Sequence, residues 1–235
     1  MIPYTTFQEK PYRPRRRLKR SWRIALTVFG VLFLLSAAAV GIQVRRQLRS
    51  RAAGLADAPG AKVSVPDWIE EDLLPLNDYS RPGEALPEVA GVVIHYVGNP
   101  GTSAKANRNY FANLAKTKET SASAHFIVGL EGEILQCVPL SEISYCSNTR
   151  NYDTIAIEVC HADETGQFSP ETLASVERLT AWLCVQFDLD TEQVIRHYDV
   201  SGKICPKYYV EHEEAWTDLL AGVGKEIQGF TEKTA

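Results

Sequence analysis

The stretch VAGVVIHY at residues 89–96 decides the fold class of this 235-residue chain. It is a continuous apolar run, rich in β-branched residues, that ends in a histidine and a tyrosine. Such a run is typical of a buried β-strand. We therefore predict a folded domain built around this strand, with His95 at the end of the strand.

Strands and helices interleave in the sequence that follows. Helices are predicted over residues 104–116, with Tyr110, Phe111 and Leu114 on the inner side, and from Ser169-Pro170, a helix start signal. A closing helix is predicted over residues 207–220. Further strands are predicted at residues 124–128, 133–138, 154–160 and 194–197, the first two forming a hairpin and the last lying at an edge. This alternation predicts an α/β fold with a mixed central β-sheet flanked by helices.

An uncharged stretch at residues 24–44 precedes this domain. As a helix with a rise of about 1.5 Å per residue it spans about 30 Å, the thickness of a bilayer core. The basic residues between Lys10 and Arg23 outnumber those that follow the stretch, so the N-terminus should stay cytoplasmic. We predict one transmembrane helix, a single-pass signal anchor in the cell membrane, with the domain outside the cytoplasm. Cleavage by signal peptidase near residues 37–39 is the alternative.

Composition and charge divide the chain into segments. We expect a basic cytoplasmic tail (1–23), the membrane anchor (24–44), a linker (45–62), a domain (63–225) that begins with an irregular arm (63–86), and a C-terminal tail (226–235). The formal net charge of −4 gives no sign of a nucleic-acid partner. The sequence does not predict the oligomeric state.

Three dispersed residues are candidate metal ligands. His95 and His197 end the first and last predicted strands, and Cys205 follows His197 by eight residues. Two imidazoles and a thiolate suit Zn²⁺ and leave a fourth coordination position open. Partly buried histidines and a structural cysteine are the alternative on spacing alone. The chain has five cysteines, an odd number, so at least one is free, bound to another chain or held by a metal.

Four motifs occur in a fixed order: VIHY (93–96), SAHFIV (123–128), IAIEVC (155–160) and RHYDVSGKICP (196–206). In this order they resemble the zinc amidase family shared by bacterial autolysins, bacteriophage endolysins and animal peptidoglycan recognition proteins. The resemblance covers about residues 65–220, and the last motif is the most specific. It implies a catalytic domain that hydrolyses the amide bond between N-acetylmuramic acid and L-alanine in peptidoglycan, with Zn²⁺ as cofactor.

The resemblance also implies roles for single residues. His95, His197 and Cys205 correspond to the zinc ligands of similar proteins. Glu158 corresponds to the carboxylate that takes a proton from the metal-bound water and delivers it to the leaving amine. Lys203 corresponds to a lysine that stabilises the oxyanion in some phage amidases.

The resemblance does not fix the roles of several other residues near the implied cleft. His125 fills a position usually held by histidine in the family, where it could line the cleft or orient a neighbour. Asn99, Arg150 and Asn151 lie in loops near the implied cleft and could contact the substrate. Some relatives carry a catalytic tyrosine where this chain has Ala124, so the burden shifts to Glu158. His161 and His212 read as ordinary polar residues. The alternatives to an amidase are a non-catalytic peptidoglycan-binding module and an amidase that acts on another acylated sugar or peptide.

Overall fold

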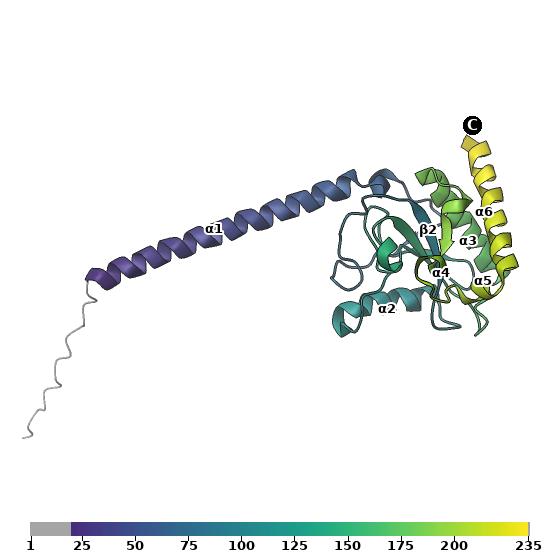
Figure 1. The fold of residues 1–235 in the computed structure, drawn as a ribbon, viewed down its shortest axis with the longest axis horizontal. Coiled ribbons are helices and arrows are strands. Elements are labelled where there is room, and N and C mark those ends of the chain that lie inside the picture. The colour runs from purple at the N-terminus through teal and green to yellow at the C-terminus, as the bar shows by residue number, and fades with distance from the viewer. Residues whose placement is uncertain (1–19, 235) are drawn as a thin grey trace, which may run out of the picture. The chain divides into compact units, whose positions relative to one another are not determined.

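The computed structural model describes residues 20–234 (Figure 1). The basic tail predicted for residues 1–23, on which the predicted orientation depends, lies outside the described residues except for its last four positions. The chain divides into two compact units, residues 1–49 and 50–235. We describe each unit by itself.

The first unit contains most of helix α1 (Arg20–Asp57). From Ile24 the helix is long and apolar enough to cross a membrane, with a mean hydropathy of 2.4 in its most apolar window and none of that window buried. Large apolar side chains such as Phe29 and Leu34 are 70% and 68% exposed. A signal sequence near an N-terminus passes the same test of length and composition.

The predicted linker, residues 45–62, has regular structure. Helix α1 continues to Asp57, and a 3₁₀ turn follows at Pro59–Lys62. The alanines, arginines and leucines of this stretch are strong helix formers, which explains why the helix passes the apolar segment. Residues 50–62 belong to the second unit, where Ala58 and Gly60 are buried. The segment boundaries derived from the sequence stay predictions.

Within the described residues, six strands form one mixed sheet in the order β1-β4-β3-β5-β2-β6. Only β3 and β4 pair antiparallel, as the predicted hairpin. The predicted strand at residues 89–96 is β2, between β5 and the edge strand β6. The bounds are β1 (Glu70–Glu71), β2 (Gly91–Tyr96), β3 (Phe126–Val128), β4 (Ile134–Gln136), β5 (Thr154–Val159) and β6 (Val194–Arg196).

Helices cover both faces of the sheet. Helices α3 (Pro170–Phe187) and α6 (Glu213–Thr234) pack on one face, and α2 (Ala104–Thr117) lies on the other (Figure 1). The short helices α4 (His197–Ser201) and α5 (Lys207–Glu211) follow β6. Ser169 caps α3 by accepting a hydrogen bond from the Thr172 amide, as its start signal predicts.

Along β5, consecutive side chains alternate between the two faces. Ile155, Ile157 and Val159 join the core under α3 and α6, whereas Ala156 joins the core on the α2 side. Glu158 therefore points away from the α3 and α6 core, as its place in the sequence predicts.

Three local predictions need correction. Tyr110 is 46% exposed, because a helix turns about 100° per residue and its neighbour Phe111 already shares the inner face with Leu114. The closing helix is two helices, α5 and α6, separated at His212. Helix α6 runs to Thr234, so residues 226–234 of the predicted tail are helical, and Ile227 and Phe230 extend its apolar stripe onto the core.

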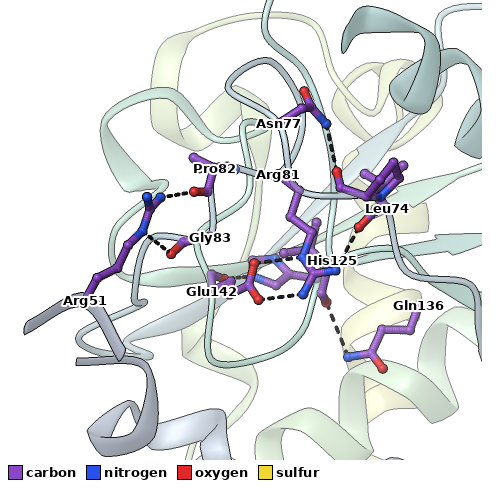
Figure 2. Close-up of polar contacts among 11 residues, drawn as sticks. Arg51, Leu74, Asn77, Arg81, Pro82, Gly83, His125, Gln136 and Glu142 are labelled. Atoms are coloured by element: carbon purple, nitrogen blue, oxygen red, sulfur yellow. Dashed lines mark hydrogen bonds and ion pairs between the residues drawn. The ribbon is translucent and has the colours of Figure 1, made fainter. Parts of the chain in front are cut away.

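The arm, residues 63–86, is irregular and packed, as predicted, apart from the two residues of β1. Its Leu74 and Leu86 are fully buried. Arg81 donates two hydrogen bonds to the Glu142 carboxylate, at 2.8 and 2.7 Å, which fixes the arm to the loop after β4 (Figure 2). From the end of α1, Arg51 donates to the carbonyl oxygens of Pro82 and Gly83.

Candidate metal centre

Three adjacent parallel strands bring the predicted site residues together. His95 lies near the end of β2, and its register partner in β5 is Glu158. Register partners on neighbouring strands point to the same face of a sheet. On its other side β2 pairs with β6, and His197 is the residue that follows β6. The three side chains therefore meet at the carboxyl edge of the sheet.

Cys205 reaches the same place through a closed loop. The five-residue helix α4 begins at His197 and ends at Ser201. It is followed by Gly202, whose φ of 76° is the left-handed conformation that glycine adopts at helix ends. The chain then turns back, and the Tyr198 amide donates to the Cys205 carbonyl oxygen at 2.9 Å. The eight-residue spacing thus places the thiol next to His197.

The geometry of these three residues suits a metal ion. The Nδ1 atoms of His95 and His197 are 3.0 Å apart, and Cys205 Sγ lies 3.9 Å from His95 Nδ1. All three residues are buried, and their ligand atoms lie within 4.8 Å of one another. Donor atoms around a tetrahedral zinc ion, at bond lengths of about 2.0–2.3 Å, lie about 3.3–3.8 Å apart. The residues present therefore fit Zn²⁺.

The protonation states also suit metal binding. Burial, His197 and Lys203 lower the pKa of His95 well below its usual value, and burial and Lys203 lower the pKa of His197. Metal ligands require the neutral imidazole. Burial raises the pKa of the Cys205 thiol to about 12. A cation is then needed to hold this sulfur as a thiolate.

Glu158 lies beside the three candidate ligands. Its Oε1 accepts a hydrogen bond from the Cys146 thiol at 3.5 Å, and its Oε2 is buried without a hydrogen-bond partner among the described residues. Burial raises the pKa of Glu158 to about 7, although the Cys146 hydrogen bond and the charge of Lys203 oppose the shift. A carboxyl group with this pKa can take up and release a proton near neutral pH. Lys203 itself is exposed.

The sequence analysis missed the loop that completes the site. Cys146, Ser147 and Asn148 contact Glu158, His95 and His197, respectively. No periodicity or motif distinguishes these residues, because the fold alone brings the loop next to the carboxyl ends of β2 and β5. The odd number of cysteines was the only signal in the sequence, and it does not single out Cys146.

His125 is not positioned to contact a substrate. It is completely buried, and its Nε2 lies 2.8 Å from the Glu142 carbonyl oxygen (Figure 2). Its Nδ1 accepts a hydrogen bond from the Ala156 backbone amide at 3.0 Å. The Ser144 hydroxyl lies 3.1 Å from the same Nδ1. Both ring nitrogens are therefore occupied within the protein, which corrects the expectation that this histidine lines the cleft.

Asn99 and Arg150, two of the loop candidates for substrate contact, are not brought to the centre. Asn99 is exposed, and its backbone carbonyl accepts from Thr102. Arg150 donates to both carboxylate oxygens of Asp153 at 2.8 Å. One of its terminal nitrogens lies beside Gly91, at the start of β2 and far from His95 along the strand. The ion pair with Asp153 occupies the Arg150 guanidinium, which argues against a substrate contact by Arg150.

The remaining histidines behave as ordinary polar residues. His161 is buried between the carbonyl oxygens of Val97 and Asp163, at 2.8 and 2.7 Å. His212 lies at the break between α5 and α6, half-exposed and 3.5 Å from the Glu214 carboxylate.

Solved structures share this fold. The catalytic domain of XlyA matches with a TM-score of 0.57 and 28% identity, over 66% of this chain and 99% of that domain. The catalytic domain of PlyG matches with a TM-score of 0.58, over 68% of this chain and 94% of that domain; its 19% identity carries the fold alone.

Curated relatives share the sequence. The amidase CwlL of Bacillus licheniformis is 32% identical over an alignment of 186 positions, which covers 71% of this chain and 51% of the relative. The amidase BlyA of Bacillus subtilis (strain 168) is 30% identical over 66% of this chain and 47% of the relative. This chain thus spans about half the length of the curated relatives it matches. Residues 85–208, more than half of the chain, match the family described as N-acetylmuramoyl-L-alanine amidase. The chain therefore belongs to the N-acetylmuramoyl-L-alanine amidase family.

Proposed function

We propose that this chain is a zinc-dependent N-acetylmuramoyl-L-alanine amidase, anchored in the membrane, that cleaves peptidoglycan outside the cytoplasm. The observation that carries the proposal is the convergence of His95, His197 and Cys205 beside Glu158. Family membership supports the reaction, since the curated relatives are named N-acetylmuramoyl-L-alanine amidases.

His95, His197 and Cys205 would hold the zinc ion. When bound, the ion supplies Lewis acidity, which polarises an amide carbonyl and makes water acidic enough to attack near neutral pH. Three protein ligands are the number found in catalytic zinc sites, where the fourth position stays open for water or substrate.

Glu158 would act as general base and then as general acid. Its carboxylate takes a proton from the attacking water and delivers it to the nitrogen of the leaving L-alanine. A pKa of about 7 makes both transfers accessible near neutral pH. The buried Oε2 without a partner supports this role, because a buried oxygen that no protein group satisfies is free to accept that proton.

Lys203 would stabilise the negative charge that develops on the carbonyl oxygen. Its charge acts on His95, His197 and Glu158, where it lowers each pKa, so the side chain lies close enough to influence the reaction centre. A positive charge at the developing oxyanion lowers the barrier for attack on an amide.

The apolar part of α1 would anchor the enzyme in the membrane. Its length and composition support a single span. Peptidoglycan lies outside the cytoplasmic membrane, so an anchored domain on that side would meet its substrate without a separate wall-binding module.

The test uses the full chain in detergent, purified peptidoglycan, and the variants Glu158→Gln, His197→Ala and Glu119→Gln. Glu119 is an exposed glutamate outside the centre and is the matched control for Glu158. We expect new L-alanine amino termini without new reducing sugar ends, lost in the first two variants and kept in the third. Zinc should be stoichiometric in all proteins except His197→Ala.

Each alternative has its own outcome in this assay. Stoichiometric zinc without cleavage of any wall preparation would replace the proposal by a peptidoglycan-binding module. Cleavage of a different acylated sugar or peptide, with peptidoglycan untouched, would keep the mechanism and change the substrate.

A further inference from the structure

One tripeptide touches three different residues of the candidate centre. Cys146 contacts Glu158, Ser147 contacts His95, and Asn148 contacts His197. We call residues 146–148 the orienting loop. Consecutive side chains of a loop point in different directions, so a single short segment can reach all three groups.

The contact with His95 fixes which ring nitrogen faces the metal position. Nε2 of His95 lies 3.1 Å from the Ser147 hydroxyl oxygen, while Nδ1 faces His197 and Cys205. A neutral imidazole carries its proton on one nitrogen only. When Ser147 accepts the proton of Nε2–H, Nδ1 is left with a free electron pair for the cation. Ser147 is 1% exposed, so water does not compete for this contact.

A second contact of the loop is with His197. Nε2 of His197 lies 3.4 Å from Nδ2 of the Asn148 side-chain amide, while Nδ1 faces His95. The oxygen and nitrogen of an asparagine amide exchange places on a half-turn of the terminal bond, so the amide oxygen can accept from Nε2–H. Asn148 is exposed and its contact is longer, so it constrains its histidine less than Ser147 does.

The orienting loop is braced from within. Oδ1 of Asn151 accepts from the backbone amides of Cys146 and Ser147, at 3.1 and 2.7 Å. The backbone amide of Asn151 in turn donates to the backbone carbonyl oxygen of Asn148 at 3.2 Å. Asn148 has a φ of 52°, a left-handed conformation that asparagine tolerates better than most residues. These bonds hold the Ser147 hydroxyl in place when no metal is bound.

We propose that Ser147 and Asn148 are positioning residues that hold both histidines in the Nε2–H tautomer and turn both Nδ1 atoms toward one zinc ion. The inference rests on the zinc site of the proposed function and does not depend on which bond the enzyme cleaves. Groups that orient metal-binding histidines in this way typically contribute about 10–100-fold to metal affinity.

Zinc affinity of the full chain in detergent tests the proposal, measured by competition with a chromophoric chelator. We expect Ser147→Ala to weaken zinc binding by about 10–100-fold. Ser147→Thr keeps the hydroxyl and should recover most of the affinity. The matched control is Ser144→Ala, which removes a buried hydroxyl three residues earlier that contacts His125. This control should bind zinc within about twofold of the wild-type chain.

A second pair of variants tests Asn148 at an exposed position, where loss of folding is not expected. Asn148→Gly accepts the positive φ and removes the amide, so it should weaken zinc binding several-fold. Asn148→Asp keeps an oxygen acceptor for Nε2–H and should bind zinc at least as well as the wild-type chain. Nitrogen NMR of the zinc-loaded wild-type chain should show Nε2 of His95 and His197 protonated.

Several results would overturn the inference. They are wild-type affinity in Ser147→Ala, an equal loss in Ser144→Ala, Nδ1–H tautomers in the zinc-loaded chain, or a wild-type chain that binds no zinc. A wild-type chain that binds zinc but leaves peptidoglycan intact would defeat the proposed function alone, and the order of zinc affinities among the variants would still decide this inference.

Discussion

Two buried clusters that contain histidine lie close to β5, and they differ in how the ring nitrogens are used. In the first, which we call the structural network, His125 has a protein partner at each ring nitrogen, the Glu142 carbonyl oxygen and the Ala156 amide. In the metal centre, His95 and His197 turn Nδ1 toward each other at 3.0 Å, next to the Cys205 thiol. Both ring nitrogens of His125 thus have hydrogen-bond partners in the protein. In His95 and His197, by contrast, the two Nδ1 atoms point to one place where a cation can bind.

This difference separates a structural histidine from a ligand more reliably than burial does. His125 is 0% exposed and His95 is 1% exposed, so exposure does not distinguish them. A buried polar network with every donor and acceptor paired stabilises one conformation. A cluster of electron-pair donors without an opposing cation does not stabilise the fold, and it gains its free energy when a metal binds.

The largest expected effect separates the two clusters by function. His197→Ala removes one of three candidate ligands, so zinc should be lost and amidase activity should fall at least about 1,000-fold, the equivalent of about 4 kcal/mol of transition-state stabilisation. The free energy of unfolding of the metal-free protein should fall by less than it does in His125→Ala, because the His197 ring contacts only side chains of the site, at 3.0 Å from His95 and 3.4 Å from Asn148 among the described residues. Zinc analysis, turnover of peptidoglycan and urea denaturation measure the three quantities. A variant with full zinc content would show that His197 is not a ligand.

The second effect is on stability. His125→Ala leaves the Glu142 carbonyl oxygen and the Ala156 amide without their buried partner and opens a cavity, so the free energy of unfolding should fall by about 3–5 kcal/mol. The fraction of the variant that stays folded should still bind zinc. Urea denaturation of the metal-free proteins gives the first quantity and chelator competition the second. Loss of zinc from a protein that is fully folded would contradict the separation of the two clusters.

The sequence predicted those parts of the fold whose residues carry their own signal, and it missed those that depend on contacts made elsewhere in the chain. The strands β2 and β5 were found because their apolar runs carry their own signal, whereas β1 is two residues long and exists only through its pairing with β4. The prediction that Tyr110 points into the core was wrong. Residue type alone does not decide which of two adjacent aromatic residues, here Tyr110 and Phe111, packs in the core.

For the site, the resemblance identified His95, His197, Cys205 and Glu158, and the fold brings these four together. The structure does not place His125 at the cleft. The sequence shows that a histidine is present but not whether its ring nitrogens already have partners. The orienting loop was missed for a related reason. Its contacts are made across the fold, and nothing in the residues 146–148 themselves indicates them.

The third effect is a pH dependence specific to the structural network. Burial lowers the pKa of His125 to about 4, against about 6.5 in an unfolded chain. Between these values the unfolded state binds more protons, so the free energy of unfolding should fall as the pH drops from about 6.5 toward 4, by about 3 kcal/mol. Above pH 6.5 this contribution is fully present.

The metal-free wild-type chain and His125→Ala measure this contribution by difference, because every other titrating group is common to both. The stability gap between them should narrow by about 3 kcal/mol from pH 7.5 to pH 4. A gap that stays constant over this range would mean that His125 is not held neutral by the structural network.

The smallest effect is expected near the end of α1, where Arg51 contacts the arm. Arg51→Ala removes the hydrogen bonds that Arg51 donates to Pro82 and Gly83 (Figure 2). Arg51 is exposed and water can replace it at both carbonyl oxygens, so the free energy of unfolding should fall by about 1 kcal/mol or less, with zinc affinity unchanged. Arg81→Ala is the comparison, because it leaves the Glu142 carboxylate buried without its partner and should cost several times more. An equal loss of unfolding free energy in Arg51→Ala and Arg81→Ala would contradict this expectation. It would mean that the stabilisation by these arginines does not depend on burial of the groups that they contact.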